Sequence, residues 1–424
     1  MKIDIENLAK IEHASVKVDG ITVIAGENNT GKSTVGKILF ALFNSTVQLE
    51  EKVYSYRRNR IYNFLRRGID EIQMLSEGSG NIWERNMIPS NRQLDRSVDE
   101  VMEADGTKEV YLAVIDFYEK LELFKPTDAI IDKLQDITIR INQTLEIEDQ
   151  KVYHVLMEDY FTKVFNGQVN NIYEPEKKAV VDLCLHNSQH LEVEFENQKC
   201  RIARMEFRTN HEAVYIDSPF LLDKINDYWY FDGNEQENLL LKKLTQDTNA
   251  EENLFEKIIA NEKLNEIFQK FDSVFKGRIL KDEDDEYKVQ YRNKPLRVSN
   301  LSTGLKSFSI IRLLLEKGML KEKDVLILDE PEIHLHPQWQ LIYAEIIVLL
   351  QKYFDLSIVI TTHSHYFLDA IEVYSAKHGI SDKVNYYLAD CKDEKATLVD
   401  VTRNLDLIYQ KLAAPLDTLD SIRY

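Results

Sequence analysis

The stretch ITVIAGENNTGKSTVGKILF, residues 21–40, decides the fold of this chain. It begins with a short apolar run, which predicts a buried β-strand. The residues Gly26–Thr34 that follow are polar and rich in glycine and asparagine, which is typical of a loop. From Val35 onward the apolar residues recur at helical spacing. The order of strand, glycine loop and helix predicts an α/β fold built around this segment.

The loop matches the pattern G-x-x-x-x-G-K-[ST]. Glycines in this pattern let the backbone curl, so that N–H groups and the positive end of the next helix face phosphates. Lys32 adds a positive charge, and the Ser33 hydroxyl is a ligand for Mg²⁺. A simple glycine turn does not require both residues, so we predict a P-loop that binds a nucleotide with Mg²⁺. Its expected binding residues are Gly26, Asn28, Asn29, Thr30, Gly31, Lys32, Ser33 and Thr34.

A second apolar run, Val325–Leu328, ends in the carboxylates of Asp329 and Glu330. In a P-loop protein this pattern indicates a Walker B strand. Burial of the strand would place Asp329 at its carboxyl end, beside the phosphates, where Asp329 and Ser33 hold Mg²⁺. Glu330 would then polarise the attacking water as the general base. The alternative is an ordinary core strand that ends in charged residues.

Further motifs complete a recognisable order along the chain. LSTG at residues 301–304 lies before the Walker B strand, DEPEIHLHP at 329–337 includes its end, and TTHS at 361–364 follows. With the P-loop, they resemble the signature, Walker B with D-loop, and switch-histidine motifs of the ABC-type ATPases. The P-loop form G-x-N-x-x-G-K-S resembles that of the SMC, recombination and repair branch of this superfamily.

The resemblance implies that two heads sandwich ATP between them. Ser302 and Gly304 of one subunit would contact the γ-phosphate held by Lys32 of the other. His363 would sense that phosphate near Glu330, as a second catalytic residue. ATP would therefore act as a clamp on the geometry of a homodimer or larger assembly.

The chain departs from the family pattern in two places. The family carries a glutamine after a strand between the P-loop and the signature, but AVYIDSP at residues 213–219 contains none. We expect Asp217 or Ser218 at that place. The D-loop carries His334 and His336, which we interpret as dimer-packing residues, with metal ligation as the alternative.

The chain between Lys32 and Ser302 is much longer than in a transporter ATPase, because it contains a helical insertion. Such insertions are typical of stand-alone ATPases in bacterial defence, including OLD-like nucleases and the ATPase subunits of Septu-type, retron-linked and PARIS systems. The stretches EPEIHLHPQWQ, ITTHSHYFL, AVYIDSPFLLD and IYQKLAAPLDTLDSIRY are most similar to the PtuA-type ATPase subunits of Septu and retron-linked systems. That resemblance implies an HNH-type nuclease as a separate chain, since the segment after His363 is too short for a nuclease domain.

We therefore expect an ATPase, converting ATP and water to ADP and phosphate, that regulates a separate nuclease effector in antiphage defence. The alternative is a DNA repair or recombination ATPase, SMC- or RecF-like, that clamps nucleic acid itself. A transporter ATPase subunit is disfavoured by the long insertion and by the HLHP sequence.

The expected fold is an ABC-ATPase-like α/β head with a P-loop parallel sheet, an antiparallel β lobe and helical insertions. The predicted parts are an N-terminal head segment (1–48), a helical insertion (49–173), a β segment (174–219), a helical subdomain (220–276) and a C-terminal head segment (277–424).

Composition limits the classes of partner. Lys and Arg number 53 against 72 Asp and Glu, a net charge of −19, so any surface for nucleic acid must be local. The three cysteines, the charged N-terminus and the lack of long apolar windows indicate a cytoplasmic protein without a membrane span.

One segment is locally basic. KVYSYRRNRIYNFLRR, residues 52–67, has six basic residues, four aromatic residues and no acidic residue. Its arginines would contact phosphates or a partner protein, or would pair with acidic neighbours above an apolar core, and these three alternatives stay open. The arginines are Arg57, Arg58, Arg60, Arg66 and Arg67.

Overall fold

The computed structural model describes residues 1–76, 89–121, 127–185, 189–207, 209–227, 232–246, 254–291, 294–392 and 394–423. The chain forms two compact units. The first combines Met1–Val47 with His154–Tyr424, and the second is Gln48–Tyr153. Parts of the predicted helical insertion (77–88 and 122–126) and of the predicted helical subdomain (228–231 and 247–253) lie outside the described residues.

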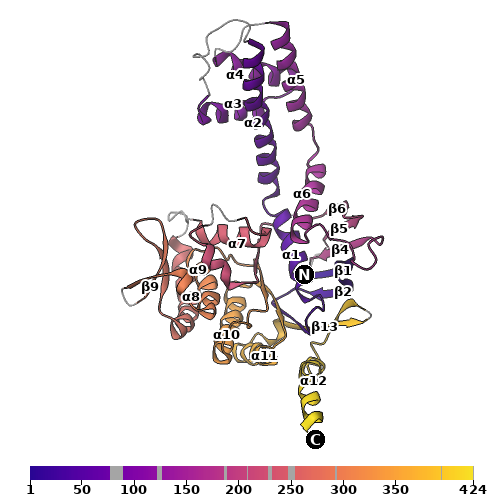
Figure 1. Ribbon diagram of the computed structural model, residues 1–424, viewed down its shortest axis with the longest axis vertical. Helices are drawn as coiled ribbons and strands as arrows, with labels where there is room; N and C mark the ends of the chain where they lie inside the picture. The colour runs from indigo at the N-terminus through magenta and orange to yellow at the C-terminus, as the bar shows by residue number, and fades with distance from the viewer. Residues whose placement is uncertain are drawn as a thin grey trace. The chain divides into compact units, whose positions relative to one another are not determined.

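The first unit contains one large mixed sheet (Figure 1). Among the described residues its strand order is β6-β5-β4-β1-β2-β14-β13-β3-β12-β11-β7. In chain order, the strands are β1 (Lys2–Leu8), β2 (Ile11–Lys17), β3 (Ile21–Gly26), β4 (Ala179–Cys184), β5 (His190–Glu196), β6 (Lys199–Met205), β7 (Ala213–Ile216), β11 (Val325–Asp329), β12 (Ser357–Thr362), β13 (Val384–Lys392) and β14 (Lys395–Asp400). The run β13-β3-β12-β11-β7 is parallel throughout. The run β6-β5-β4-β1-β2 is antiparallel.

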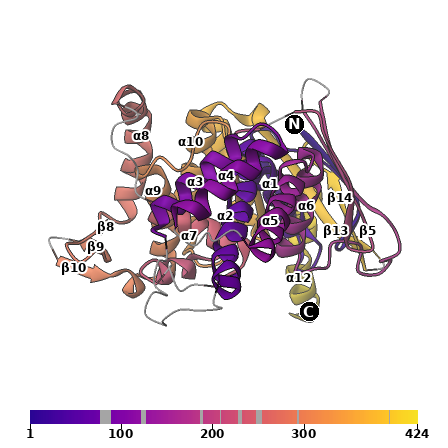
Figure 2. The same cartoon turned by 90° about the horizontal axis from the view of Figure 1, so that it is seen from above.

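A smaller sheet and several helices complete this unit. β8 (Arg278–Lys281), β9 (Tyr287–Tyr291) and β10 (Lys294–Arg297) form an antiparallel sheet, which lies on the opposite side of the unit from β5 and β14 (Figure 2). The α-helices are α1 (Lys32–Thr46), α6 (Asp149–Val164, which begins in the second unit), α7 (Glu235–Thr245), α8 (Leu254–Val274), α9 (Thr303–Glu316), α10 (Pro337–Phe354), α11 (His365–His378) and α12 (Asp406–Arg423). Short 3₁₀ helices are η2 (Pro219–Lys224), η4 (Val298–Asn300) and η5 (Ser381–Lys383).

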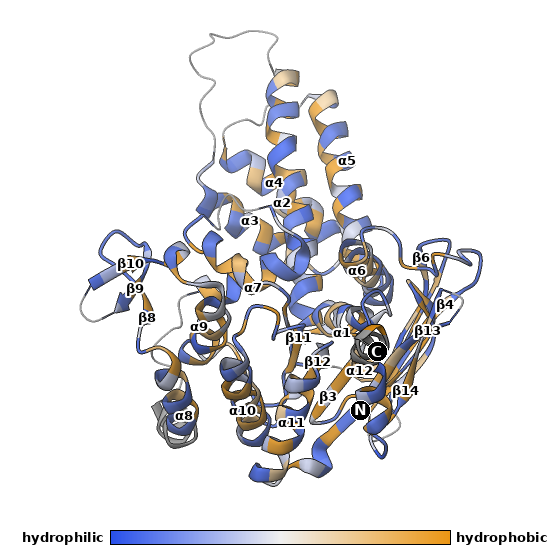
Figure 3. Cartoon of the chain, turned by 60° about the horizontal axis from the view of Figure 1, so that its bottom comes forward, coloured by the Kyte–Doolittle hydropathy of each residue, from blue (hydrophilic) through white to orange (hydrophobic). Residues whose placement is uncertain are grey.

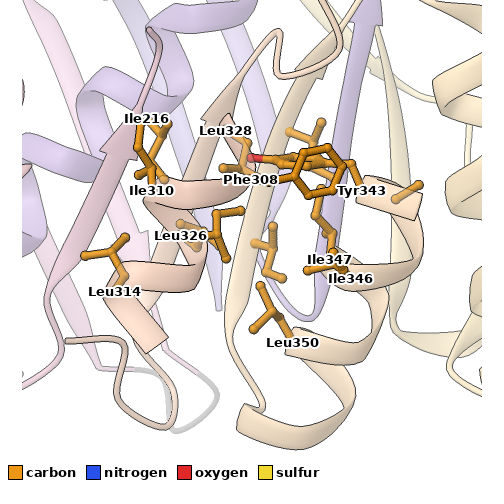
Figure 4. Close-up of a cluster of buried hydrophobic side chains, with 14 of the residues drawn as sticks. Ile216, Phe308, Ile310, Leu314, Leu326, Leu328, Tyr343, Ile346, Ile347 and Leu350 are labelled. Carbon is orange, nitrogen blue, oxygen red and sulfur yellow. The ribbon is translucent and has the colours of Figure 1, made fainter. Parts of the chain in front are cut away.

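The parallel strands are buried on both faces, which explains their nearly continuous apolar sequence. On β11, Leu326 and Leu328 face one core together with residues of α9, α10 and α11. Val325 and Ile327 face the other core, together with residues of α1. Figure 4 shows the first core, where side chains from α9 and α10 pack against β11. This two-sided packing fixes the strands whose carboxyl ends carry the predicted motifs.

The second unit is helical. Its described helices are α2 (Leu49–Ser76), α3 (Asn91–Glu103), α4 (Thr107–Lys120) and α5 (Asp128–Leu145). Hydrophobic and hydrophilic residues alternate along α2 and α5 at helical spacing (Figure 3), and the apolar faces of the four helices form one core. At Gly68 a Cβ atom would lie 2.1 Å from the Tyr118 hydroxyl, so glycine lets α4 approach α2 closely.

The fold class predicted from the sequence is confirmed. The fold class is α/β with a parallel P-loop sheet, antiparallel strands and helical segments. The antiparallel strands continue the main sheet through the parallel pair β2–β14 and do not form a separate layer. The acidic residues 282–286 form the turn between β8 and β9. Among the described residues, no helix is long and apolar enough to cross a membrane. The five-part division of the chain stays a prediction.

Candidate active site

The loop between β3 and α1 has the curled backbone that its glycines predict. Gly31 and Asn29 adopt left-handed conformations, with φ of 78° and 67°. At Gly26 a Cβ atom would lie 2.4 Å from the Ala389 carbonyl oxygen of β13, so a larger residue would push the strands apart. The Thr30 hydroxyl donates to the Glu27 carbonyl at 2.8 Å, which closes the loop.

Helix α1 begins at the end of this loop without a side-chain cap. Gly31 occupies the N-cap position, and in the described part of the chain no side chain caps this end of the helix. The first N–H groups of a helix lack partners within the helix and attract anions. Lys32 is 5% exposed, and its Nζ donates to the Gly26 and Glu27 carbonyls at 3.0 and 2.7 Å. These donors and this charge suit the phosphates of a nucleotide.

Three hydroxyl groups surround the Asp329 carboxylate at the end of β11. The Ser33 hydroxyl donates to Oδ1 at 2.8 Å, and the Tyr215 hydroxyl donates to Oδ2 at 2.7 Å. The Thr361 hydroxyl of β12 also donates to Oδ1. Burial raises the pKa of the Tyr215 phenol, and the negative charge of Asp329 adds to the rise. Tyr215 therefore stays a hydrogen-bond donor at neutral pH.

Glu330 lies one residue beyond the strand in a strained backbone conformation, with φ of 50°. Its N–H donates both to the Thr361 carbonyl at 3.1 Å and to the Thr361 hydroxyl at 3.0 Å. Its carboxylate lies 3.4 Å from Lys32 Nζ and 3.4 Å from His363 Nδ1. The predicted base and the predicted switch histidine therefore meet beside the P-loop lysine.

A further carboxylate, that of Glu332, lies next to His363. Glu332 is 2% exposed, and its Oε1 accepts hydrogen bonds from the Thr362 hydroxyl at 2.5 Å and from the His363 N–H at 3.2 Å. His363 Nδ1 is 3.9 Å from the same oxygen. Burial raises the pKa of the Glu332 carboxyl, although the hydrogen bond from Thr362 opposes this effect.

The signature residues lie at the start of α9. Ser302 is exposed at the N-cap position and makes no side-chain cap. Gly304 is buried, and a Cβ there would lie 3.0 Å from the Trp339 ring and 3.1 Å from the His334 carbonyl. Within the described parts of the chain, no hydrogen bond or ion pair joins residues 302–307 to the P-loop. This arrangement agrees with the expected contact of the signature to another subunit, which stays a prediction.

The two departures from the family pattern have local structural roles. Ser218 caps η2 by accepting a hydrogen bond from the Phe220 N–H at 3.3 Å, whereas Asp217 is exposed at the end of β7. His336 Nδ1 accepts from the Gln338 N–H at 3.3 Å and caps α10, and His334 contacts the Phe220 ring edge-to-face. No group of three or more His, Cys, Asp or Glu side chains suited to a metal occurs among the described residues.

The basic segment lies in α2, where its arginines differ in environment. Arg57 pairs with Asp149 at 2.8 Å, and Arg58 pairs with Asp95 at 3.0 Å and with Asp99 at 2.9 Å. For these two arginines the structure agrees with the alternative in which they pair with acidic neighbours. The other three, Arg60, Arg66 and Arg67, are exposed, and no ion pair joins them to a carboxylate of the described residues.

Sequence reasoning missed Tyr215, Thr361 and Glu332. Tyr215 stands in the strand that was considered for the missing glutamine, two residues before Asp217. Thr361 belongs to the TTHS motif, and Glu332 belongs to DEPE. A polar residue inside an otherwise apolar strand was the available signal for Tyr215 and Thr361, because a buried hydroxyl requires a partner.

The donor set fits ATP with Mg²⁺. Ser33 and Asp329 lie within hydrogen-bond distance of each other, which is the placement expected for a ligand and a water-mediated ligand of Mg²⁺. Magnesium sites of this kind use one or two protein carboxylates with phosphates and water, so a larger cluster of acidic residues is not required. Lys32 and the uncapped start of α1 supply the positive side of the site.

Comparisons with known proteins agree with this geometry. A protein-family model described as "AAA domain, putative AbiEii toxin, Type IV TA system" matches residues 202–369, which is less than half of the chain but includes Tyr215, the signature, the Walker B strand and His363. No curated protein matches the chain.

Solved structures with a similar chain trace include SMC heads. The SMC head domain from Thermotoga maritima has 11% identity and a TM-score of 0.37, covering 94% of this chain and 98% of that chain. The SmcHead bound to the C-winged helix domain of ScpA has 8% identity and a TM-score of 0.40, covering 94% and 97%. The Pyrococcus furiosus Smc head domain with an extended coiled coil has 11% identity and a TM-score of 0.32, covering 100% and 99%. At these scores the fold assignment depends on the strand order above, and the family match together with the motif geometry supports a P-loop ATPase.

Proposed function

We propose that this chain binds ATP with Mg²⁺ and hydrolyses it to ADP and phosphate. The observation that carries the proposal is the convergence of Lys32, Ser33, Asp329, Glu330 and His363 at the start of α1. These side chains come from segments far apart in the sequence, and they meet only because β3, β12 and β11 are parallel neighbours.

Each residue has a chemical task in this proposal. Lys32 and the N–H groups of α1 bind the negative charge of the β- and γ-phosphates. When bound, Mg²⁺ supplies charge neutralisation between these phosphates, with Ser33 and Asp329 as its protein contacts. Glu330 accepts a proton from the attacking water, and its strained turn, held by Thr361, fixes the carboxylate near His363. His363 would contact the γ-phosphate near Glu330.

The proposal includes the pairing of two heads around ATP. Exposed Ser302 at the start of α9 presents uncapped N–H groups, which suit a phosphate bound by a second copy. The side chains of Phe220 and Ile333 are 50% and 53% exposed and provide apolar surface. This surface lies near the start of α9, because Phe220 contacts His334 of the D-loop, and the His334 carbonyl lies beside Gly304. Head pairing would cover this surface and complete the site.

We further propose that the paired heads regulate a separate effector, an HNH-type nuclease, in antiphage defence. The family described above is named for a putative toxin, which agrees with a defence role. A repair or recombination ATPase that clamps nucleic acid is the second candidate. It is favoured by the exposed Arg60, Arg66 and Arg67 of α2.

The experiment that tests the ATPase uses the Glu330→Gln variant. The amide keeps the size of the side chain but cannot accept the proton, so turnover should fall about 100-fold or more while ATP binding persists. Light scattering should then show a dimer in ATP and Mg²⁺ that does not dissociate. The matched control is Glu322→Gln, an exposed residue near the amino end of β11, which should behave as the wild type. Normal hydrolysis by Glu330→Gln would contradict the assignment of the base, and a monomer would contradict head pairing.

A further inference from the structure

Glu332 is a buried carboxylate that the proposed reaction does not use. It lies in the turn that follows β11, and its side chain points beneath the end of β12 to Thr362 and His363. Its second oxygen, Oε2, is buried and has no hydrogen-bond partner among the residues that the structure describes. No lysine or arginine of the described residues forms an ion pair with it, and the nearest ionisable partner is His363.

A buried carboxylate in this state lowers stability, because it loses water without gaining a full set of donors. Another buried carboxylate, that of Asp324, is better satisfied. Asp324, at the amino end of the same strand, is also 2% exposed, but its two oxygens accept from the Glu212 and Lys321 N–H groups at 3.1 and 2.8 Å. The buried carboxylates at the two ends of β11 therefore differ in their hydrogen bonding. Glu332, the incompletely paired one, is the one that lies at the candidate active site.

The contacts of Glu332 lead to the switch histidine. Its Oε1 accepts a hydrogen bond from the backbone N–H of His363. The Nδ1 atom of the His363 ring lies 3.9 Å from this oxygen and 3.4 Å from the Glu330 carboxylate. The backbone carbonyl of Glu332 is held in turn by Gln340 Nε2 at 3.3 Å, and the same amide donates to the Leu335 carbonyl at 3.1 Å. Glu332 thus connects the D-loop, at the start of α10, to His363.

We propose that Glu332 is a positioning residue for ATP hydrolysis, which acts by holding His363 in place against Glu330. This inference rests on the proposed ATPase function. The hydrogen bonds from Thr362 and His363 fix the end of β12, so that the imidazole faces the base. Through Gln340, a movement of the D-loop on head pairing would reach His363 by way of Glu332.

The test is a double-mutant cycle measured with ATP and Mg²⁺ on the full chain. Glu332→Ala should lower kcat about 10-fold or more, because small displacements of catalytic groups have large effects on rate, while the ATP Kd stays within about twofold. In a His363→Ala background, Glu332→Ala should cause no further loss, since it acts through that side chain. Glu332→Gln, which keeps an oxygen for both donors, should recover most of the activity. Asp324→Ala, the control, should lower Tm but leave kcat unchanged in both backgrounds.

Two outcomes would overturn the inference: wild-type kcat in Glu332→Ala, or losses from Glu332→Ala and His363→Ala that multiply. If Glu332→Ala does not fold, Thr362→Val removes one of the two donors and should show the same direction with the same absence of effect in His363→Ala. Full turnover by His363→Ala would overturn this inference and leave the ATPase intact. A wild-type chain without ATP turnover would instead remove the proposed function.

Discussion

The proposed phosphate site in the first unit and the basic half of α2 in the second unit both contain several charged side chains, but the two sets are arranged differently. In the site, Lys32, Asp329, Glu330 and His363 come from separate segments and meet at one place. On α2, the arginines belong to one continuous helix, and Arg58 pairs with carboxylates of α3 in its own unit.

The difference shows how to separate a binding site from a charged surface. An arginine that has a carboxylate partner nearby is explained by the packing of its unit, and such exposed pairs contribute little stability. Charges that converge on the uncapped start of a helix, with hydroxyl groups around a carboxylate, suit the binding of an anionic ligand. The predictions below test this distinction in both regions.

The largest effect is expected at Lys32. Lys32→Ala should weaken ATP binding at least about 100-fold, because hydrogen bonds to charged groups contribute about 1.5–3 kcal/mol each. Isothermal titration calorimetry with ATP and Mg²⁺ measures this loss. The control is Lys243→Ala, because Lys243 is also buried but pairs with Glu212 of its own unit. ATP affinity equal to the wild type in Lys32→Ala would remove the P-loop assignment and, with it, the distinction between the two regions.

A smaller effect is expected at Tyr215. Tyr215→Phe removes one of three hydroxyl groups from Asp329, and loss of such an outer partner should raise the Mg²⁺ concentration for half-maximal ATPase activity about 10-fold. Titration of ATPase activity with Mg²⁺ gives this value. Tyr387→Phe is the matched control, since the buried Tyr387 hydroxyl accepts from the Lys17 N–H in the same sheet. An unchanged Mg²⁺ requirement in Tyr215→Phe would show that the hydroxyl serves stability alone.

A comparison of Lys32 and Asp329 with Tyr215 and Thr361 shows which site residues a sequence can predict. Lys32 and Asp329 were predicted because each occupies a fixed place in a local motif, after an apolar run that specifies a strand. Tyr215 was not, because its contact depends on the register between β7 and β11, where Ile327 pairs with Tyr215. Likewise Thr361 reaches Asp329 because β12 lies beside β11 with these two residues in register.

The strand order explains the other differences between the predicted and the observed fold. Apolar runs predicted β3 and β11, since these patterns are local. They did not predict that β14 pairs with β2 and joins the antiparallel strands to the parallel ones. For α2, composition predicted a basic helix, but the acidic partners of Arg57 and Arg58 come from residues 95–149, which no local pattern connects to them.

The smallest effect is expected on α2, where Arg67 and Arg58 form a matched pair on one helix. If the exposed arginines contact nucleic acid, Arg67→Ala should reduce the slope of log K against log salt by about 0.7 for single-stranded DNA and lower affinity about fourfold at 0.15 M salt. Arg58→Ala should leave both values unchanged and lower the free energy of unfolding by at most about 1 kcal/mol. Fluorescence anisotropy with a labelled single-stranded oligonucleotide, at several salt concentrations, measures the slopes. Equal slopes for wild type and Arg67→Ala would assign the whole basic segment to the packing and solvation of its own unit, because then neither kind of arginine on α2 would meet a phosphate.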